Sequence, residues 1–207
     1  MGKGIGLSCI ALGVICLVIA FGRVAYNHYE EKAGEQASQS LLQDVQKNMN
    51  AAEGTQPQKT AEDILPEEIQ NPIPLQMLTV PVDDYESIGI LTIPVIELEL
   101  PVLTDWNYEK LKKAPCHYYG SCYTSNFVIT AHNYDSHFGG LPQLQAGDLV
   151  IFTDVTGQTH NYEVVLLETL PPTATEEMIT SGFDLSLYTC TPGGNNRVTV
   201  RCNTANK

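Results

Sequence analysis

A thiol and a guanidinium are expected to face each other near the C-terminal end of the chain. Leu185–Cys190 and Arg197–Cys202 alternate apolar and polar side chains on either side of six turn-forming residues. If that loop closes symmetrically, the two segments form an antiparallel hairpin in which Cys190 lies opposite Arg197, with Cβ atoms about 4.5–5.5 Å apart. A cation beside a thiol stabilises the thiolate, so Cys190 is a candidate nucleophile.

The same register tests two rival interpretations. Free cysteines are often plain core residues, but here Cys190 shares the polar face of the hairpin with Tyr188 and Arg197. Arg201 falls opposite Ser186, about 13 Å along the strand from Cys190. We therefore expect Arg197 to be the cation beside the thiol. Changing Arg201 to lysine should leave the activity nearly unchanged.

A nucleophilic cysteine needs a histidine within reach. One of the five histidines lies in the N-terminal third and His160 lies in an expected turn, which leaves His117, His132 and His137. His132 directly follows the apolar run Phe127–Ala131. It is expected to project from the end of a strand into a loop, where catalytic groups commonly lie.

The elements that must position these residues are mainly strands. Short β-branched runs separated by turn residues predict a closed barrel or a sandwich, with brief helices near Trp106–Lys113 and Phe138–Gln143. The expected strands are Ile88–Ile93, Val95–Leu103, Phe127–Ala131, Leu149–Thr153, Asn161–Leu170, Leu185–Cys190 and Arg197–Cys202.

The N-terminal segment predicts a membrane anchor. Gly4–Gly22 has almost no polar side chain, and its nineteen residues give a helix of about 28 Å, close to the thickness of the hydrocarbon layer. A cleaved signal peptide is the alternative, but no clear cleavage site follows before Arg23. We expect residues 1–23 to form a single-pass anchor, with the acidic C-terminal part outside the cell.

Residues 24–76 predict a stalk between the anchor and a domain over residues 77–207. This stretch is acidic and rich in glutamine, which is typical of a solvated spacer. Ala33–Met49 is expected to be helical, and Ala51–Leu75 to be a flexible linker. The formal net charge of −13, with no basic cluster, argues against nucleic-acid binding.

Several motifs, taken in order, resemble the sortase family of Gram-positive surface transpeptidases. The resemblance covers about Tyr85 to Cys202 and follows an N-terminal anchor, as is usual in that family. Its motifs are Gly89–Pro94, Leu100–Val102, Ile129–Asn133, His137–Leu141, Gly147–Asp148, Ser186–Cys190 and Arg197. Ser186 and Ala131 depart from the family's usual threonine and glycine.

The resemblance implies an eight-stranded β-barrel and a thiol transpeptidase that needs no cofactor or metal. By that likeness Cys190 attacks a sorting signal similar to Leu-Pro-x-Thr-Gly, and His132 exchanges protons with the leaving and incoming amines. Arg197 stabilises the oxyanion or the substrate backbone. The implied partners are surface proteins bearing such a signal and an amine acceptor of the cell wall. Pilin-polymerising members of the family usually carry an Asp-Pro-aromatic lid motif and a second membrane segment. Neither is found in this sequence.

Two other interpretations stay open. Cys116 and Cys122, together with His132 and His137, loosely resemble a zinc site, although a disulfide or two free thiols are favoured. The second alternative is a membrane-anchored β-domain, zinc- or disulfide-stabilised, that binds envelope components without catalysis. Three acidic residues, Glu176, Glu177 and Asp184, suggest a calcium site only weakly.

Overall fold

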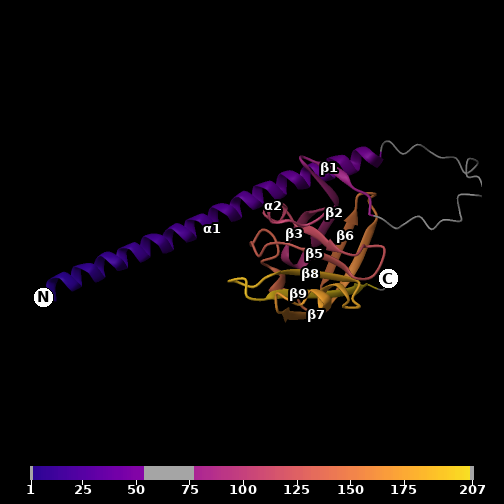
Figure 1. Cartoon of the computed structure of the whole chain (residues 1–207). Helices are drawn as coiled ribbons and strands as arrows, with labels where there is room; N and C mark the ends of the chain where they lie inside the picture. Colours follow the sequence, from indigo (N-terminus) through magenta and orange to yellow (C-terminus); the bar gives the residue numbers. More distant parts are fainter. Residues whose placement is uncertain (1, 54–76, 206–207) are drawn as a thin grey trace, which may run out of the picture.

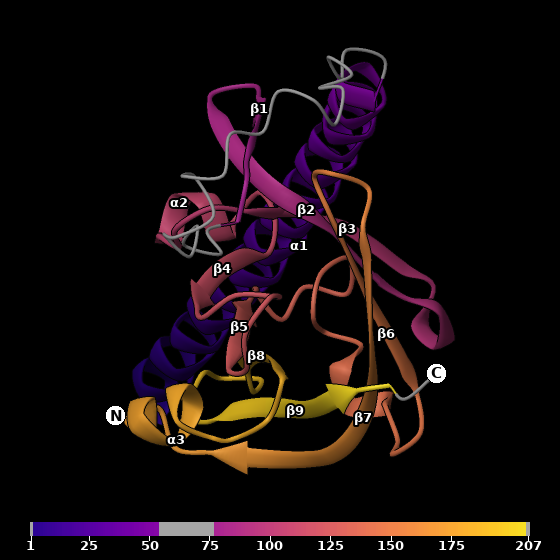
Figure 2. The same ribbon diagram turned by 90° about the vertical axis from the view of Figure 1, so that its right-hand side faces the viewer.

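The protein is described by a computed structural model that covers residues 2–53 and 77–205. Most of the linker expected at Ala51–Leu75 lies outside these residues. All nine strands of the described residues are joined into one sheet that curls into a barrel (Figures 1 and 2). The strands are β1 Val80–Val82, β2 Tyr85–Ile93, β3 Leu98–Leu103, β4 Cys116–Tyr119, β5 Phe127–Thr130, β6 Leu149–Asp154, β7 Thr159–Leu170, β8 Leu185–Cys190 and β9 Arg197–Thr204.

Eight of these strands form a closed ring, which confirms the expected barrel. The order along the sheet is β1-β2-β3-β4-β5-β8-β9-β7-β6, and a further pairing of β2 with β6 closes it. β1 extends β2 outside the ring. Apolar side chains from the inner faces fill the interior, with Phe127, Leu91 and Val200 each fully buried. Closure of the ring removes the exposed strand edges that an open sheet would carry.

The β8–β9 hairpin has the expected register. Leu185 pairs with Cys202, Ser186 with Arg201, and Cys190 with Arg197. The connecting loop is held by its own backbone: the Thr191 N–H donates to the Asn196 carbonyl at 2.9 Å. Gly193 and Gly194 both have positive φ, +85° and +76°, a conformation that residues with a Cβ rarely adopt. The loop sequence therefore fixes the juxtaposition of Cys190 and Arg197.

Some expected elements differ from the structure. The strand expected from Val95 begins later, because Pro94–Ile96 forms a 3₁₀ turn before β3. β4 and a short helix α3, Thr175–Ile179, were not expected, whereas α2, Tyr108–Leu111, and a 3₁₀ turn at Leu141–Gln143 lie within the expected helical regions. His160 lies in β7 rather than in a turn, because the tight turn ends before Thr159.

Helix α1, Gly2–Glu53, is one continuous α-helix of 52 residues. By its length and composition it is the one helix in the described part of the chain that is suited to cross a membrane. Its apolar side chains from Ile10 to Phe21 are more than half exposed, and this part of the helix extends away from the barrel (Figure 1).

The second half of α1 packs on the barrel, which differs from the solvated spacer expected there. Leu41 and Val45 are buried in a small core with Val82, Ile90 and Leu103. Figure 2 shows the helix lying along the side of the barrel that carries β1, β2 and α2. The composition of this segment resembled a spacer because it is acidic and rich in glutamine, although one stripe of the helix is apolar.

Candidate functional site

The site is built where three strands end together. β5 and β8 run parallel, with Thr130 beside Tyr188. Two residues further along each chain, His132 and Cys190 leave the barrel at the same end, and the Thr189 hydroxyl donates to the Ala131 carbonyl at 2.8 Å. Arg197 begins β9 directly opposite Cys190. The structure therefore brings together the three residues expected from the sequence.

One cavity of about 220 Å³ joins these side chains, and Cys190, His132 and Arg197 all line it. Its walls are aromatic and apolar. Tyr118 packs edge-on against Tyr188 and also contacts Trp106, and residues between Pro171 and Met178 add to the lining. The further lining residues are Tyr108, Leu111, Thr130, Ala131, Pro171, Pro172, Ala174, Thr175 and Met178. An apolar pocket with a few polar groups is suited to an extended peptide.

Histidine 132 is half-buried between this pocket and helix α1. Its ring stacks on Tyr134 with centroids 4.9 Å apart. Burial lowers the pKa of His132 below its ordinary value, whereas the Glu30 carboxylate on α1 opposes that shift. His132 is therefore mainly neutral at pH 7, and helix α1 contributes to its proton affinity through Glu30.

Helix α1 also holds the backbone that follows His132. The Glu31 carboxylate accepts a hydrogen bond from the Asp135 N–H at 2.9 Å. Gly34 lies so close that an added Cβ would meet the Lys112 carbonyl oxygen at 2.9 Å and the Tyr134 ring at 3.2 Å. No motif pointed to this contact, because it joins segments about a hundred residues apart.

The other two candidate histidines have structural positions. His137 is fully buried, and burial lowers its pKa to about 4, so it stays neutral. The Nε2 atom of His117 lies 2.8 Å from the Gly120 carbonyl in the turn after β4. Cys116 and Cys122 are free thiols rather than a disulfide. The four residues of the less favoured zinc alternative are not arranged as one site, because His132 lines the Cys190 pocket and His137 is fully buried in the loop beside α1.

Arg197 keeps donors available for a ligand. Its Nη1 donates to the carbonyls of Gly194 and Asn196, both at 3.1 Å. These bonds turn the guanidinium toward the loop beside Cys190 and use one of its three nitrogens. The remaining N–H groups provide a cationic donor that can polarise a carbonyl bound in the pocket.

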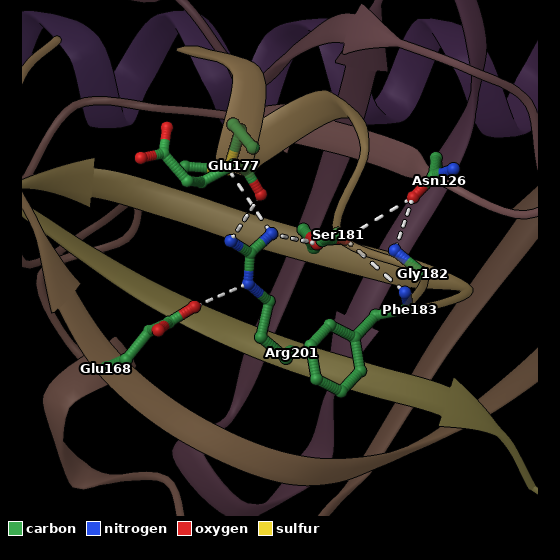
Figure 3. Close-up of polar contacts among 9 residues, drawn as sticks. Asn126, Glu168, Glu177, Ser181, Gly182, Phe183 and Arg201 are labelled. Atoms are coloured by element: carbon green, nitrogen blue, oxygen red, sulfur yellow. Dashed lines mark hydrogen bonds and ion pairs between the residues drawn. The ribbon is translucent and has the colours of Figure 1, made fainter. Parts of the chain in front are cut away.

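Arg201 has several structural contacts, although the sequence predicted that its substitution by lysine would have almost no effect. It is 2% exposed, and its Nε donates to the Glu168 carboxylate at 2.7 Å. Its two other nitrogens donate to the Ser186 hydroxyl and to the Glu177 carbonyl, at 2.8 Å and 2.9 Å. Figure 3 shows the guanidinium between Glu168 and Glu177, beside the Phe183 ring.

The Arg201 contacts join α3 to the barrel. Because α3 provides Thr175 and Met178 to the pocket wall, Arg201 supports the site without touching Cys190. We therefore no longer expect Arg201→Lys to have almost no effect on the protein.

The three acidic residues considered as calcium ligands do not form one site. The Asp184 carboxylate instead accepts hydrogen bonds from the N–H and hydroxyl of Thr204.

Sequence reasoning missed the aromatic wall of the pocket. Trp106 lies in a segment that was interpreted only as a short helix, and Tyr118 lies between two cysteines that were weighed as metal or disulfide partners, so neither was expected to line the site. Together the wall, thiol, imidazole and guanidinium form an arrangement that can perform nucleophilic acyl transfer.

Comparison with known proteins gives the family. A family model described as the sortase domain matches residues 91–205. Among solved structures, sortase C from Clostridium perfringens SM101 is 21% identical, with 89% of this chain and 98% of that chain covered and a TM-score of 0.53. A Clostridium perfringens sortase D5 transpeptidase is 20% identical, with 58% and 79% covered and a TM-score of 0.52.

Sortase C1 from Streptococcus suis is 29% identical, with 58% of this chain and 74% of that chain covered and a TM-score of 0.50. No curated protein matches the chain. The domain match spans more than half of the chain and includes Cys190, Arg197 and His132. The chain therefore belongs to the sortase family, and it is a cysteine transpeptidase of that family.

Proposed function

We propose that this transpeptidase cleaves a sorting signal similar to Leu-Pro-x-Thr-Gly and transfers the protein to an amine of the cell wall. The observation that carries the proposal is the Cys190–Arg197 cross-strand pair, with His132 beside it around one pocket. The proposal assigns the chemistry to these three side chains.

In the first step His132 takes the proton of the Cys190 thiol, and the resulting thiolate attacks the threonine carbonyl of the signal. Arg197 donates to the developing oxyanion, the C–N bond breaks, and His132 as imidazolium gives its proton to the leaving amine. A thioester to Cys190 remains. In the second step an amine attacks the thioester, His132 takes the amine's proton, and the thiolate leaves. The two steps form one peptide bond for each one broken.

The proposed location is the cell membrane, with α1 crossing it once and the barrel outside. The exposed apolar surface of α1 before Arg23 supports this anchoring, because such side chains have no partner within the described protein. The barrel then lies on the side where sorting signals and wall precursors occur.

The test uses the full-length chain in detergent micelles, incubated with a Leu-Pro-x-Thr-Gly peptide and triglycine. Intact mass spectrometry should show a hydroxylamine-sensitive adduct of the N-terminal peptide fragment, and the product should carry triglycine. The Cys190→Ala variant should show neither. Peptide binding without cleavage by the wild-type chain would instead indicate the non-catalytic envelope-binding domain.

A further inference from the structure

A second thiol–imidazole pair lies far from the pocket. Cys122 lies in the loop between β4 and β5, Asp154 ends β6, and His160 is the second residue of β7. One ligand atom from each lies within 4.8 Å of the others. Since β7 pairs with Arg197 only at Leu170, ten strand residues, or about 33 Å along the strand, separate His160 from that position.

The carboxylate of this cluster is already held in place. Its Oδ1 accepts hydrogen bonds from the Thr156 hydroxyl and backbone N–H, at 2.6 Å and 2.9 Å, and from the Gln158 N–H at 3.1 Å. Its Oδ2 accepts from the Tyr123 hydroxyl at 2.9 Å. Outer-shell bonds of this kind orient the ligands of metal sites.

The spacing of the imidazole and the carboxylate suits a tetrahedral ion. The His160 Nε2 lies 3.1 Å from the Asp154 Oδ2. Two ligands with bonds of about 2.0–2.1 Å to zinc lie about 3.3 Å apart at a tetrahedral angle. The Cys122 thiol is the third ligand. All three ligand atoms lie within 4.8 Å of one another, so each needs to move by less than about 2 Å to bind one ion.

Space for a fourth ligand lies beside the cluster. A cavity of about 210 Å³ is lined by Cys122 and His160, and also by Tyr162 and Thr204. The Asp154 and His160 side chains are only 3% and 12% exposed. The cluster is therefore shielded, yet a water molecule and an ion have a route to it.

We propose that Cys122, Asp154 and His160 bind one zinc ion, with water as the fourth ligand. A set of sulfur, nitrogen and one oxygen favours zinc over calcium or magnesium, which prefer oxygen ligands. The ion would fasten the loop before β5 to the β6–β7 hairpin. This site shares only Cys122 with the zinc set considered from the sequence, and it is independent of the proposed function.

The test uses the full-length chain in micelles, freed of metal with a chelator and titrated with Co²⁺ and then Zn²⁺. Wild type should bind one Co²⁺ per chain with a thiolate-to-cobalt absorption band, which Zn²⁺ should abolish. Excess Zn²⁺ should raise Tm by about 5–10 °C at a hundredfold excess over Kd.

Two variants and a matched control decide the assignment. Cys122→Ser should lose the band, and His160→Gln should weaken Co²⁺ binding at least tenfold, while Cys116→Ser, which alters a buried thiol elsewhere, should bind like wild type. A band that survives in Cys122→Ser, or wild type that binds no Co²⁺ and gains no Tm from Zn²⁺, overturns the proposal. If Cys122→Ser does not fold, His160→Gln with a wild-type melting curve and unchanged Co²⁺ affinity overturns it equally.

Discussion

Cys190 and Cys122 each have a histidine nearby, but the third residue differs. Cys190 lies opposite Arg197 and lines an open pocket. Cys122 is 9% exposed and lies beside Asp154, and burial together with that carboxylate raises the pKa of its thiol to about 12 in the metal-free protein. The comparison teaches that the charge beside a thiol–imidazole pair decides its chemistry: a cation favours a nucleophile, whereas an anion favours either an inert thiol or a metal ligand.

The largest effect is expected from Cys190→Ala. Cleavage of the sorting peptide should fall to background, because no other nucleophile lines the pocket in the same position, while Tm should stay within about 3 °C of wild type. Peptide turnover and thermal melting check this. Cys202→Ala is the matched control, since its buried thiol lies on the same hairpin; activity retained by Cys190→Ala would break the comparison.

A smaller loss is expected from His132→Ala. General acid–base catalysis contributes about 10²–10⁴-fold, so kcat should fall by that factor with the fold intact. Steady-state kinetics measure the loss. His117→Ala is the control, because that ring contacts the turn after β4 and the Phe127 ring and does not line the Cys190 pocket; an equal loss there, with a normal melting curve, would show that the wrong histidine was assigned.

Substitution of the two arginines by lysine should affect different properties, namely kcat for Arg197 and stability for Arg201. Arg197→Lys should lower kcat by about 10²-fold with little change in Tm, because one ammonium cannot reproduce the donors of a guanidinium. Arg201→Lys should instead lower the free energy of unfolding by about 1–3 kcal/mol, since buried polar partners around Ser186 and Glu177 lose a donor. Kinetics and melting of both variants separate the roles, and the same pattern in both would contradict them.

The smallest effect is expected from Glu30→Gln. Removing this carboxylate destabilises the imidazolium of His132, so its pKa falls further and the pH limb that reports it moves to lower pH. Because the Glu30 side chain is 28% exposed, the shift should be less than about one unit. The pH dependence of kcat/KM measures it, with the exposed Glu35→Gln as control. A shift to higher pH would contradict the role given to α1.

Much of the site was predictable because its geometry is local. The hairpin has a six-residue loop and clear alternation, which determine the pairing of Cys190 with Arg197. The position of His132 at a strand end followed from the apolar run before it, although its choice over His117 came from the family resemblance.

The missed features depend on contacts between distant segments. The stripe of α1 that packs on β1–β3 has few apolar residues within an acidic stretch, so its partner was not visible in the sequence. The Cys122 cluster needs the loop before β5 to meet the β6–β7 hairpin, and neither segment has a metal-binding spacing of its own. Arg201 was judged only by its distance from Cys190, whereas its role is set by α3 packing against it.

The unbroken α1 has a geometric consequence for the proposed anchoring. The helix meets the His132 loop at Glu31, nine residues and about 13 Å beyond Gly22, and contacts β1 further along, from Leu41 to Asn48. In Figure 1 the loop between β8 and β9 points toward the side on which the N-terminus of α1 lies. In the proposed anchoring the pocket end of the barrel is therefore directed toward the bilayer, and the number of helical residues between them sets its distance and rotation. One alanine inserted after Arg23 would lift the pocket by about 1.5 Å and rotate it by about 100° around the helix axis. Access to membrane-held substrates should then vary with the helical period of the inserted length, while turnover of a free peptide stays constant.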